Sequence, residues 1–452
     1  MSAPTIDAGR RGLLRFATAG SVDDGKSTLV GRLLHDSKSV LADQLEAVEL
    51  TSQARGLATP DLSLLVDGLR AEREQGITID VAYRYFATPA RTFILADTPG
   101  HVQYTRNTVT GASTADVVVI LTDARTGVVA QTRRHATIAA LVGVRHLVLA
   151  VNKIDLVDYD EQVFGRIADE FADYASGLGV PEVTSIPISA LHGDNVVARS
   201  ERIRWYSGPS VLEHLEQLDI THEIAGEALR FPVQYVIRPR TAEHPDYRGY
   251  AGRVAAGTVR PGDEVVALPS GRRSTVVAID TADGERPFAR AGDSVTLLLA
   301  DDLDISRGEL IAAAADAPEP VSEFTATVTH LAERPLRAGS RVLLRHGTTS
   351  TRAIVTAIES LLDIDTLATS TPPEALNLND IAQIGIRVAE PVAVEDFRPG
   401  GAVGALLLVD PADGTTLAAG MAGDRRAALL DGRCRPAAAG PADLDSLPTP
   451  GP

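Results

Sequence analysis

The stretch Gly20-Ser21-Val22-Asp23-Asp24-Gly25-Lys26-Ser27 matches the pattern G-x-x-x-x-G-K-[ST]. An apolar run at 14–19 precedes it, and a segment with helical character, 26–35, follows it. A strand, a glycine-containing turn and a helix in this order form a loop whose backbone N–H groups surround a phosphate. The sequence therefore predicts a phosphate-binding loop with these nucleotide contacts: Gly20, Ser21, Val22, Asp23, Asp24, Gly25, Lys26, Ser27 and Thr28.

Two side chains of this loop carry distinct chemistry. We expect Lys26 to span the β- and γ-phosphates of the nucleotide, and the Ser27 hydroxyl to coordinate Mg²⁺. Lysine is rare in this chain, because only Lys26, Lys38 and Lys153 are lysine among 43 Lys and Arg residues. A planar guanidinium does not imitate a compact ammonium on a flexible stem. The surviving lysines at 26 and 153 therefore indicate sites that need lysine.

Around the loop the chain alternates between strand and helix patterns, which is typical of an α/β unit with a largely parallel sheet. Strands are predicted at 14–19, 81–86, 92–96, 117–121, 147–151 and 183–188, and helices at 26–35, 132–142, 162–175 and 210–217. From Leu229 onward, short alternating runs broken by Gly and Pro indicate small β-barrels, and after Val409 the chain is rich in Ala, Gly and Pro. We predict an α/β P-loop domain over 1–228, all-β barrel domains over 229–316 and 317–410, and a poorly ordered tail over 411–452.

Asp97-Thr98-Pro99-Gly100 follows the apolar run 93–96, and we expect all four residues to contact the nucleotide. A carboxylate at a strand end can hold Mg²⁺ through water, and a glycine N–H can approach the γ-phosphate because no Cβ obstructs it. His101 comes next in the chain. Because orienting the attacking water is the usual task of the protein in phosphoryl transfer, His101 is the candidate catalytic residue.

Asn152-Lys153-Ile154-Asp155 follows the predicted strand 147–151. The Asp155 carboxylate can accept hydrogen bonds from guanine N1–H and the 2-amino group, which adenine does not offer in that arrangement. We expect Lys153 to cover the base plane and Asn152 to tie this segment to the phosphate loop. Ser189-Ala190, after the strand 183–188, is expected to present a backbone N–H to guanine O6. These residues predict GTP as the ligand.

A charged segment, 72–79, lies between the phosphate loop and Asp97. Thr78 in this segment is expected to supply a second hydroxyl to Mg²⁺ while its N–H reaches the γ-phosphate. The predicted metal ligands are therefore Ser27, Thr78 and Asp97, and the segment is expected to become ordered around the triphosphate.

The composition limits the possible partners. A net charge of -17 argues against broad nucleic-acid binding, which depends on a basic surface. The longest apolar runs are far shorter than the ~20 residues that cross a bilayer, and the first eleven residues contain no apolar export segment. The single cysteine, Cys434, agrees with a reducing compartment. We expect a cytoplasmic protein that binds neither nucleic acid nor membrane.

In this order, the motifs resemble the translation-factor class of GTPases, in which a G domain precedes two β-barrels. Within that class, the chain is similar to the GTPase subunit (subunit 1) of heterodimeric sulfate adenylyltransferase over roughly residues 13–410. The similarity is carried by the phosphate loop with Thr28-Leu29, by residues 67–86, by Tyr104-Thr105-Arg106-Asn107, by Phe231-Pro232-Val233-Gln234-Tyr235-Val236 and by Arg248-Gly249-Tyr250-Ala251-Gly252.

The resemblance implies a division of labour between two proteins. GTP hydrolysis would accompany formation of adenosine 5′-phosphosulfate and pyrophosphate from ATP and sulfate, while adenylyl transfer itself would belong to a separate, smaller catalytic ATP-sulfurylase subunit. The resemblance also implies that Val22 and Ile77 form an apolar gate that His101 passes to reach water. Val102 departs from the family pattern, which has an acidic residue at that position.

Two alternatives remain open. An elongation factor that delivers aminoacyl-tRNA has the same scaffold, but its loop more typically reads G-H-V-D-H-G-K-T-T, which differs at Ser21, Asp24 and Ser27. A GTP-binding regulatory or scaffold protein without useful hydrolysis is the other alternative. His101 argues against it, because a scaffold needs no group that orients water.

Overall fold

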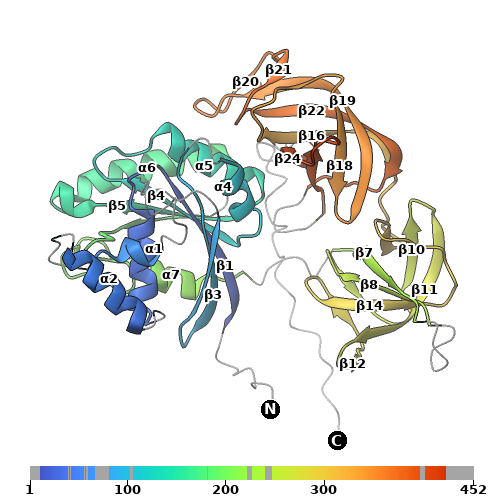
Figure 1. The fold of residues 1–452 in the computed structure, drawn as a ribbon, viewed down its shortest axis with the longest axis horizontal. Helices are drawn as coiled ribbons and strands as arrows, with labels where there is room; N and C mark the ends of the chain where they lie inside the picture. Colours follow the sequence, from blue (N-terminus) through green and yellow to red (C-terminus); the bar gives the residue numbers. More distant parts are fainter. Residues whose placement is uncertain are drawn as a thin grey trace, which may run out of the picture.

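The computed structural model describes residues 11–38, 40, 42–54, 56, 60–66, 81–101, 105–180, 182–220, 227–239, 247–397 and 403–423. Figure 1 shows an α/β domain at the N-terminal side of the chain and two β-barrels that follow it. The predicted fold class, an α/β domain followed by two all-β barrels, is confirmed.

The α/β domain contains a six-stranded sheet in the order β2-β3-β1-β4-β5-β6. β2 runs antiparallel to β3, and the other neighbours are parallel. The strands are β1 (Arg11–Gly20), β2 (Ala82–Ala87), β3 (Arg91–Asp97), β4 (Val117–Asp123), β5 (His146–Asn152) and β6 (Glu182–Pro187). The helices are α1 (Lys26–Asp36), α2 (Ala42–Ala54), α4 (Thr105–Ala112), α5 (Ala130–Leu141), α6 (Glu161–Gly177) and α7 (Val211–Gln217), with short 3₁₀ helices η1 (Leu62–Leu65) and η3 (Ile154–Val157).

Helices cover both faces of this sheet. On one face, β1 packs Leu14 and Phe16 against Leu29 and Leu33 of α1. On the other face, helices α4, α5 and α6 cover the sheet, and Phe171 of α6 is fully buried there. Burying each such side chain contributes about 1.5–3 kcal/mol. Because the parallel strands are buried on both sides, they appear in the sequence as continuous apolar runs.

The first barrel closes through six strands, because β10 pairs with both β11 and β15. Its wall consists of β7 (Arg230–Ile237), β8 (Gly249–Arg253), β10 (Glu264–Leu268), β11 (Arg272–Thr281), β14 (Ser294–Leu299) and β15 (Leu310–Ala313), with the short strands β9 (Thr258–Val259), β12 (Gly284–Glu285) and β13 (Ala289–Arg290) beside it. Phe231, Tyr250 and Leu297 fill its centre.

The second barrel also closes through six strands, with β18 paired to β19 and β23. Its wall consists of β16 (Val321–His330), β18 (Arg341–His346), β19 (Thr349–Leu362), β22 (Ile381–Val392), β23 (Ala405–Val409) and β24 (Thr416–Ala422), with the short strands β17 (Leu336–Arg337), β20 (Thr369–Ser370) and β21 (Ala375–Leu376). Val328, Ile384 and Leu408 lie in its core.

One prediction about the chain end is wrong. Residues 411–423 are part of the second barrel and not of a poorly ordered tail, because β24 pairs with β16 on one side and β23 on the other. Without β24 the ring of strands would be open. Small residues such as Ala418 and Gly420 fit this strand because Val328 and Leu406 pack closely against it, so the Ala- and Gly-rich composition was misleading. Residues 424–452 lie outside the described part of the chain.

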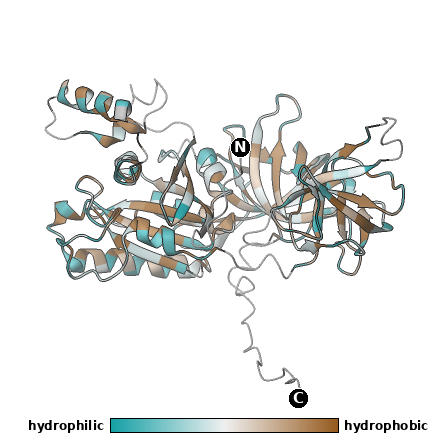
Figure 2. Ribbon diagram, turned by 90° about the horizontal axis from the view of Figure 1, so that it is seen from below, coloured by the Kyte–Doolittle hydropathy of each residue, from teal (hydrophilic) through white to brown (hydrophobic). Residues whose placement is uncertain are grey.

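The parts of the molecule contact one another through specific side chains. Val109 of α4 and Ile138 of α5 pack against Leu331 and Ala419 of the second barrel. The Tyr174 hydroxyl of α6 donates to a backbone carbonyl of the same barrel at 2.6 Å. Figure 2 shows hydrophobic residues concentrated along the strands of the sheet and of both barrels. No helix in the described ranges combines the length and the apolar character needed to cross a membrane.

Candidate nucleotide-binding site

The predicted phosphate loop connects the end of β1 to the start of α1. Gly25 precedes the helix with φ of 90° and ψ of 28°, a left-handed conformation that favours glycine. A Cβ on Gly25 would lie 2.4 Å from the Asn152 amide nitrogen. Glycine is therefore required here both by the backbone angle and by the close approach of Asn152, and the first N–H groups of α1 remain directed at the space in front of the loop.

Lys26 is held inside this loop by backbone carbonyl groups. Its Nζ donates to Gly20 O at 2.8 Å and to Ser21 O at 3.0 Å. The side chain is buried, and this burial lowers the pKa of the Lys26 ammonium, whereas the nearby carboxylates of Asp97, Asp24 and Asp23 act in the opposite direction. Neutral carbonyls fix the ammonium without cancelling its charge, so the charge stays available to an anion.

The end of β3 meets the phosphate loop directly. The Thr18 hydroxyl of β1 donates to Asp97 Oδ1 at 2.9 Å, and the Thr98 hydroxyl donates back to Thr18 O at 2.6 Å. A Cβ on Gly100 would lie 2.3 Å from Lys26 Nζ and 2.4 Å from Gly20 O. Only glycine fits at position 100, which places this backbone beside the ammonium that is expected to bind the γ-phosphate.

Asn152 at the end of β5 joins three loops. Its Nδ2 donates to Asp24 O at 2.7 Å, and its Oδ1 accepts from Ala190 N at 2.9 Å. Lys153 has φ of 60°, and its Nζ donates to Asp23 O at 2.5 Å. The two residues thus hold the segment around Asp155 against the phosphate loop, which is the arrangement that the sequence predicted for Asn152.

The base-recognition residues lie at the same edge of the sheet. Asp155 is at the start of η3, and His192 Nε2 lies 3.9 Å from its Oδ2. Ser189 and Ala190 are buried, and their N–H groups donate to Asp194 O and Asn152 Oδ1. In this structure the pair therefore positions Asn152 and the loop 189–194, and the contact of its backbone with guanine O6 stays a prediction.

The structure brings most of the predicted site residues together at the carboxyl ends of β1, β3, β5 and β6. The loop residues 20–28, the segment 97–100, Asn152, Lys153, Asp155, Ser189 and Ala190 all lie there. His101 is exposed and follows Gly100 directly, and Val22 is 41% exposed. Thr78, Ile77 and Val102 lie outside the described residues, so their predicted roles are not tested.

The sequence did not predict two residues that contact the predicted site residues. Asp123, at the end of β4, lies 3.0 Å from Lys153 Nζ and 2.6 Å from an Arg125 guanidinium nitrogen. Burial alone would raise the pKa of Asp123, but hydrogen bonds from Arg125 and Lys153 hold it well below its usual range. The position of Asp123 after an all-apolar strand, parallel to that of Asp97, is the signal that predicts such a residue.

His135 of α5 is a second missed residue. Its ring is fully buried close to Gly20 and Lys26. Burial and the positive charges of Lys26 and Arg134 lower the pKa of His135 to about 3, although a hydrogen bond with the Gly20 backbone acts in the opposite direction. Arg134 donates to Gln131 Oε1, which orients the Gln131 amide so that its Nε2 donates to His135 Nε2 at 3.1 Å. The neutral ring therefore carries its proton on Nδ1. A histidine in a helix gives no local signal of this placement.

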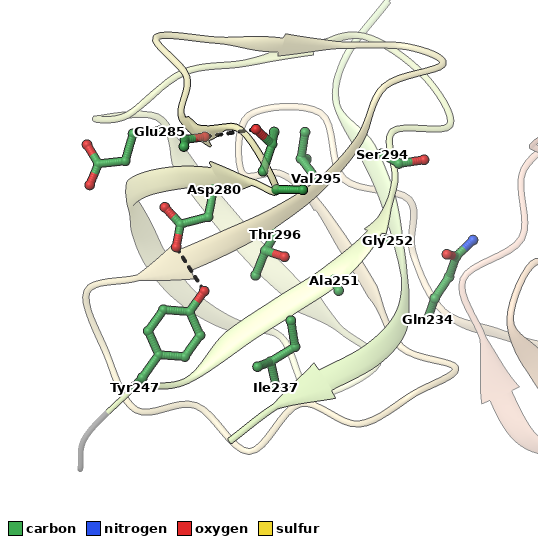
Figure 3. Close-up of a pocket in the computed structure, with 13 residues that line it drawn as sticks. Gln234, Ile237, Tyr247, Ala251, Gly252, Asp280, Glu285, Ser294, Val295 and Thr296 are labelled. Carbon is green, nitrogen blue, oxygen red and sulfur yellow. Dashed lines mark hydrogen bonds between the residues drawn. The ribbon is translucent and has the colours of Figure 1, made fainter. Parts of the chain in front are cut away.

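A second hollow lies in the first barrel and has the wrong chemistry for a triphosphate. It has a volume of about 660 Å³ between β7, β8, β11, β12 and β14, and Figure 3 shows Asp280 and Glu285 on its wall. Tyr247 donates to Asp280 at 2.8 Å. Among the described residues that line it there is no lysine or arginine, so its carboxylates would repel phosphate.

These features define a P-loop GTPase of the translation-factor class. The family model of the elongation factor Tu GTP binding domain matches residues 11–229, and that of the GTP-eEF1A C-terminal domain-like family matches residues 323–422. Sulfate adenylyltransferase subunit 1 of Shewanella oneidensis is 49% identical over 417 residues, which are 91% of this chain and 85% of that protein. The chain belongs to the family of sulfate adenylyltransferase subunit 1.

Two further proteins are similar to the chain. The "Bifunctional enzyme CysN/CysC" of Mycobacterium tuberculosis is 53% identical over 410 residues, which are 90% of this chain and 67% of that enzyme. Among solved structures, sup35 complexed with GMPPNP is 25% identical, covers 92% of this chain and 95% of its own, and has a TM-score of 0.41.

Proposed function

We propose that this chain is the GTP-hydrolysing subunit of a sulfate adenylyltransferase. Its GTP hydrolysis is coupled to formation of adenosine 5′-phosphosulfate and pyrophosphate from ATP and sulfate, and a separate catalytic subunit carries out the adenylyl transfer. The observation that supports this most strongly is the network in which Asn152 bridges Asp24 of the phosphate loop and Ala190 of the base loop. It sits in a chain that is 49% identical to subunit 1 of this enzyme from Shewanella oneidensis.

The nucleotide is bound by positively charged and N–H groups at its phosphates and by a negatively charged carboxylate at its base. At the phosphate end, Lys26 Nζ and the N–H groups at the start of α1 stabilise the β- and γ-phosphates. At the base end, the Asp155 carboxylate accepts from guanine N1–H and the 2-amino group, and the stem of Lys153 covers the ring. An adenine base would leave Asp155 without donors, which is costly for a partly buried carboxylate.

The residues at the phosphate end fit a hard divalent cation. The Ser27 hydroxyl and the Asp97 carboxylate are oxygen donors of the kind that Mg²⁺ prefers, and the hydrogen bond from Thr18 orients Asp97. In the described part of the chain no three His, Cys, Asp or Glu side chains form a metal cluster, which agrees with a cation that is held largely by the nucleotide and water. Thr78 is the proposed second hydroxyl. When bound, Mg²⁺ neutralises charge on the β- and γ-phosphate oxygens.

His101 is the proposed catalytic residue for hydrolysis. It follows Gly100, whose backbone lies against Lys26 and Gly20, and this adjacency supports a position of the imidazole next to the expected γ-phosphate. There the imidazole would orient the attacking water. Val22 and Ile77 are the proposed apolar gate in front of it. The protein would work in the cytoplasm in complex with its catalytic partner.

Reconstitution tests this function. The full chain is produced together with an ATP-sulfurylase catalytic subunit, and adenosine 5′-phosphosulfate is measured from ATP and sulfate with GTP, without GTP and with GTP plus the Asp155→Asn variant. We expect a stable complex and product formation that depends on GTP in the wild type and falls in the variant. Equal product with and without GTP would contradict the coupling.

A further inference from the structure

The phosphate loop contains a buried carboxylate that the proposed function does not require. Asp24 precedes Gly25 and is 6% exposed. Its Oδ2 accepts a hydrogen bond from Ser21 N at 2.6 Å, which means that the side chain turns back behind the loop instead of toward solvent. Its backbone carbonyl accepts from Asn152. Asp24 therefore stabilises the loop through the hydrogen bond from Ser21 N, but a neutral acceptor would form the same hydrogen bond.

Among the described residues, none forms an ion pair with the Asp24 carboxylate. In the described chain, Lys26 Nζ is bound to carbonyl oxygens of the loop, and Lys153 pairs with Asp123 instead. Burial raises the pKa of Asp24, and Asp123 adds to the increase, whereas the Ser21 N–H, Lys26 and Lys153 act in the opposite direction. A carboxylate in this position places negative charge against the Ser21 N–H of the loop that is expected to bind phosphate.

From this geometry we infer that Asp24 is an affinity-lowering residue, whose charge weakens the binding of GDP and GTP and accelerates release of GDP. The inference rests on the guanine-nucleotide site proposed above. Its physical basis is the repulsion between a poorly solvated carboxylate and the nucleotide phosphates, which the loop N–H groups and Lys26 only partly offset. A GTPase with this residue exchanges GDP for GTP without a separate exchange factor.

The chain offers a matched control for this charge. Asp116 is a partly buried carboxylate, its Oδ2 accepts from Arg15 N at 2.7 Å, and burial raises its pKa as well. However, Arg15 lies in the middle of β1, whereas the phosphate loop follows the end of that strand. Asp24→Asn and Asp116→Asn thus remove the same charge and keep the same kind of hydrogen bond, one in the phosphate loop and the other at mid-strand.

The test measures the release of a fluorescent GDP analogue from the full chain at pH 8, and the Kd values of GDP and GTP by titration. We expect Asp24→Asn to slow release and lower both Kd values by about 10- to 100-fold, and Asp116→Asn to match the wild type within about twofold. Asp24→Ala removes the charge and the brace together, and we expect release that is still slower than in the wild type.

Three results would overturn the inference. Release from Asp24→Asn at the wild-type rate or faster would show that the charge has no effect. Faster release from Asp24→Ala combined with an unchanged Asp24→Asn would assign the residue a bracing role only. An equal slowing in Asp116→Asn would show a general effect of net charge. Failure of the wild-type chain to bind GDP or GTP at all would instead contradict the proposed function.

Discussion

The buried charges of the barrels and the buried Lys26 of the nucleotide site have opposite surroundings. In the first barrel, Arg230 is buried and forms two hydrogen bonds with the Glu395 carboxylate at 2.6 and 2.7 Å. In the second barrel, Asp410 is buried and pairs with Arg334. At the nucleotide site, Lys26 is equally buried but is bound to backbone carbonyls, with no carboxylate within ion-pairing distance among the described residues.

The difference shows which charges hold the structure and which are reserved for a ligand. A paired buried charge joins two parts of the chain, as Arg230 of the first barrel and Glu395 beyond β22 do. A buried charge without a counter-ion costs stability, since desolvation is not repaid. It persists where an anion such as a triphosphate completes the site. Lys26, unlike the paired Asp123 of the same site, is therefore the buried charge that is left for a ligand.

The largest expected effect comes from Lys26→Arg. The guanidinium keeps the charge, but it is too wide for a position that is already in contact with Gly20, Ser21 and the backbone of Gly100. We expect GTP binding, measured by titration, to weaken by roughly 10³-fold or more. Lys38→Arg is the matched control, because Lys38 is exposed at the end of α1, and it should bind GTP like the parent. Normal binding by Lys26→Arg would mean that the lysine is not needed for its shape.

The corresponding change in the barrels should affect stability and leave nucleotide binding intact. Arg230→Ala leaves Glu395 without its principal partner, and we expect the free energy of unfolding to fall by about 3–5 kcal/mol. Chemical denaturation measures this loss. The double variant Arg230→Met with Glu395→Leu should recover most of the stability. GTP affinity lost in Arg230→Ala under native conditions would contradict the separation of the two kinds of charge.

Asp155→Asn changes the base end of the site. An amide cannot accept both guanine donors, and its own donor suits the 2-oxo group of xanthine. We expect GTP affinity to fall about 100-fold and xanthosine triphosphate to become the better ligand. Parallel titrations with both nucleotides decide this. Unchanged GTP affinity would remove Asp155 from the base site.

His101→Ala tests the proposed catalytic residue. The chain alone is expected to hydrolyse GTP slowly, at ~10⁻⁴ to 10⁻³ s⁻¹, and to be stimulated by the catalytic subunit with its substrates. The variant should bind GTP normally but lose about 100-fold of the stimulated kcat, because the imidazole acts in the transition state. Single-turnover hydrolysis with and without the partner measures this. Equal stimulation in variant and parent would place the catalytic group elsewhere.

The smallest expected effect concerns His135 and pH. Its pKa is about 3 in the folded chain and 6.5 for an ordinary histidine, so the unfolded state binds more protons between these values. Stability should therefore increase with pH across this window, with a contribution from His135 of up to about 1.4 kcal/mol per pH unit. Denaturation curves at pH 5 and 7 should show a smaller difference for His135→Gln than for the parent. An identical pH dependence would show that the ring is accessible to protons when folded.

Much of the nucleotide site could be predicted from local sequence, because its residues follow strands at fixed points. The phosphate loop follows β1, Asp97 is the last residue of β3, and Asp155 lies three residues after the end of β5. In a parallel sheet the carboxyl ends of such strands share one edge, so the convergence of these motifs follows from the pattern alone. The six strands of the α/β domain were predicted for the same reason.

Only the tertiary structure shows the features of the site that depend on contacts between residues distant in the sequence. Asn152 and Asp24 are 128 positions apart, and only the folded sheet shows that one amide holds the phosphate loop and the base loop together. The burial of His135 beside Lys26 and the pairing of Lys153 with Asp123 are likewise invisible in the sequence. The role of β24 was misjudged because Ala and Gly carry no strand signal, yet a barrel needs small residues where its walls approach closely. The sequence determined the order of the motifs and strands, because these depend on local patterns. The tertiary structure decided which buried charges have a partner of opposite charge, because such partners are distant in the sequence.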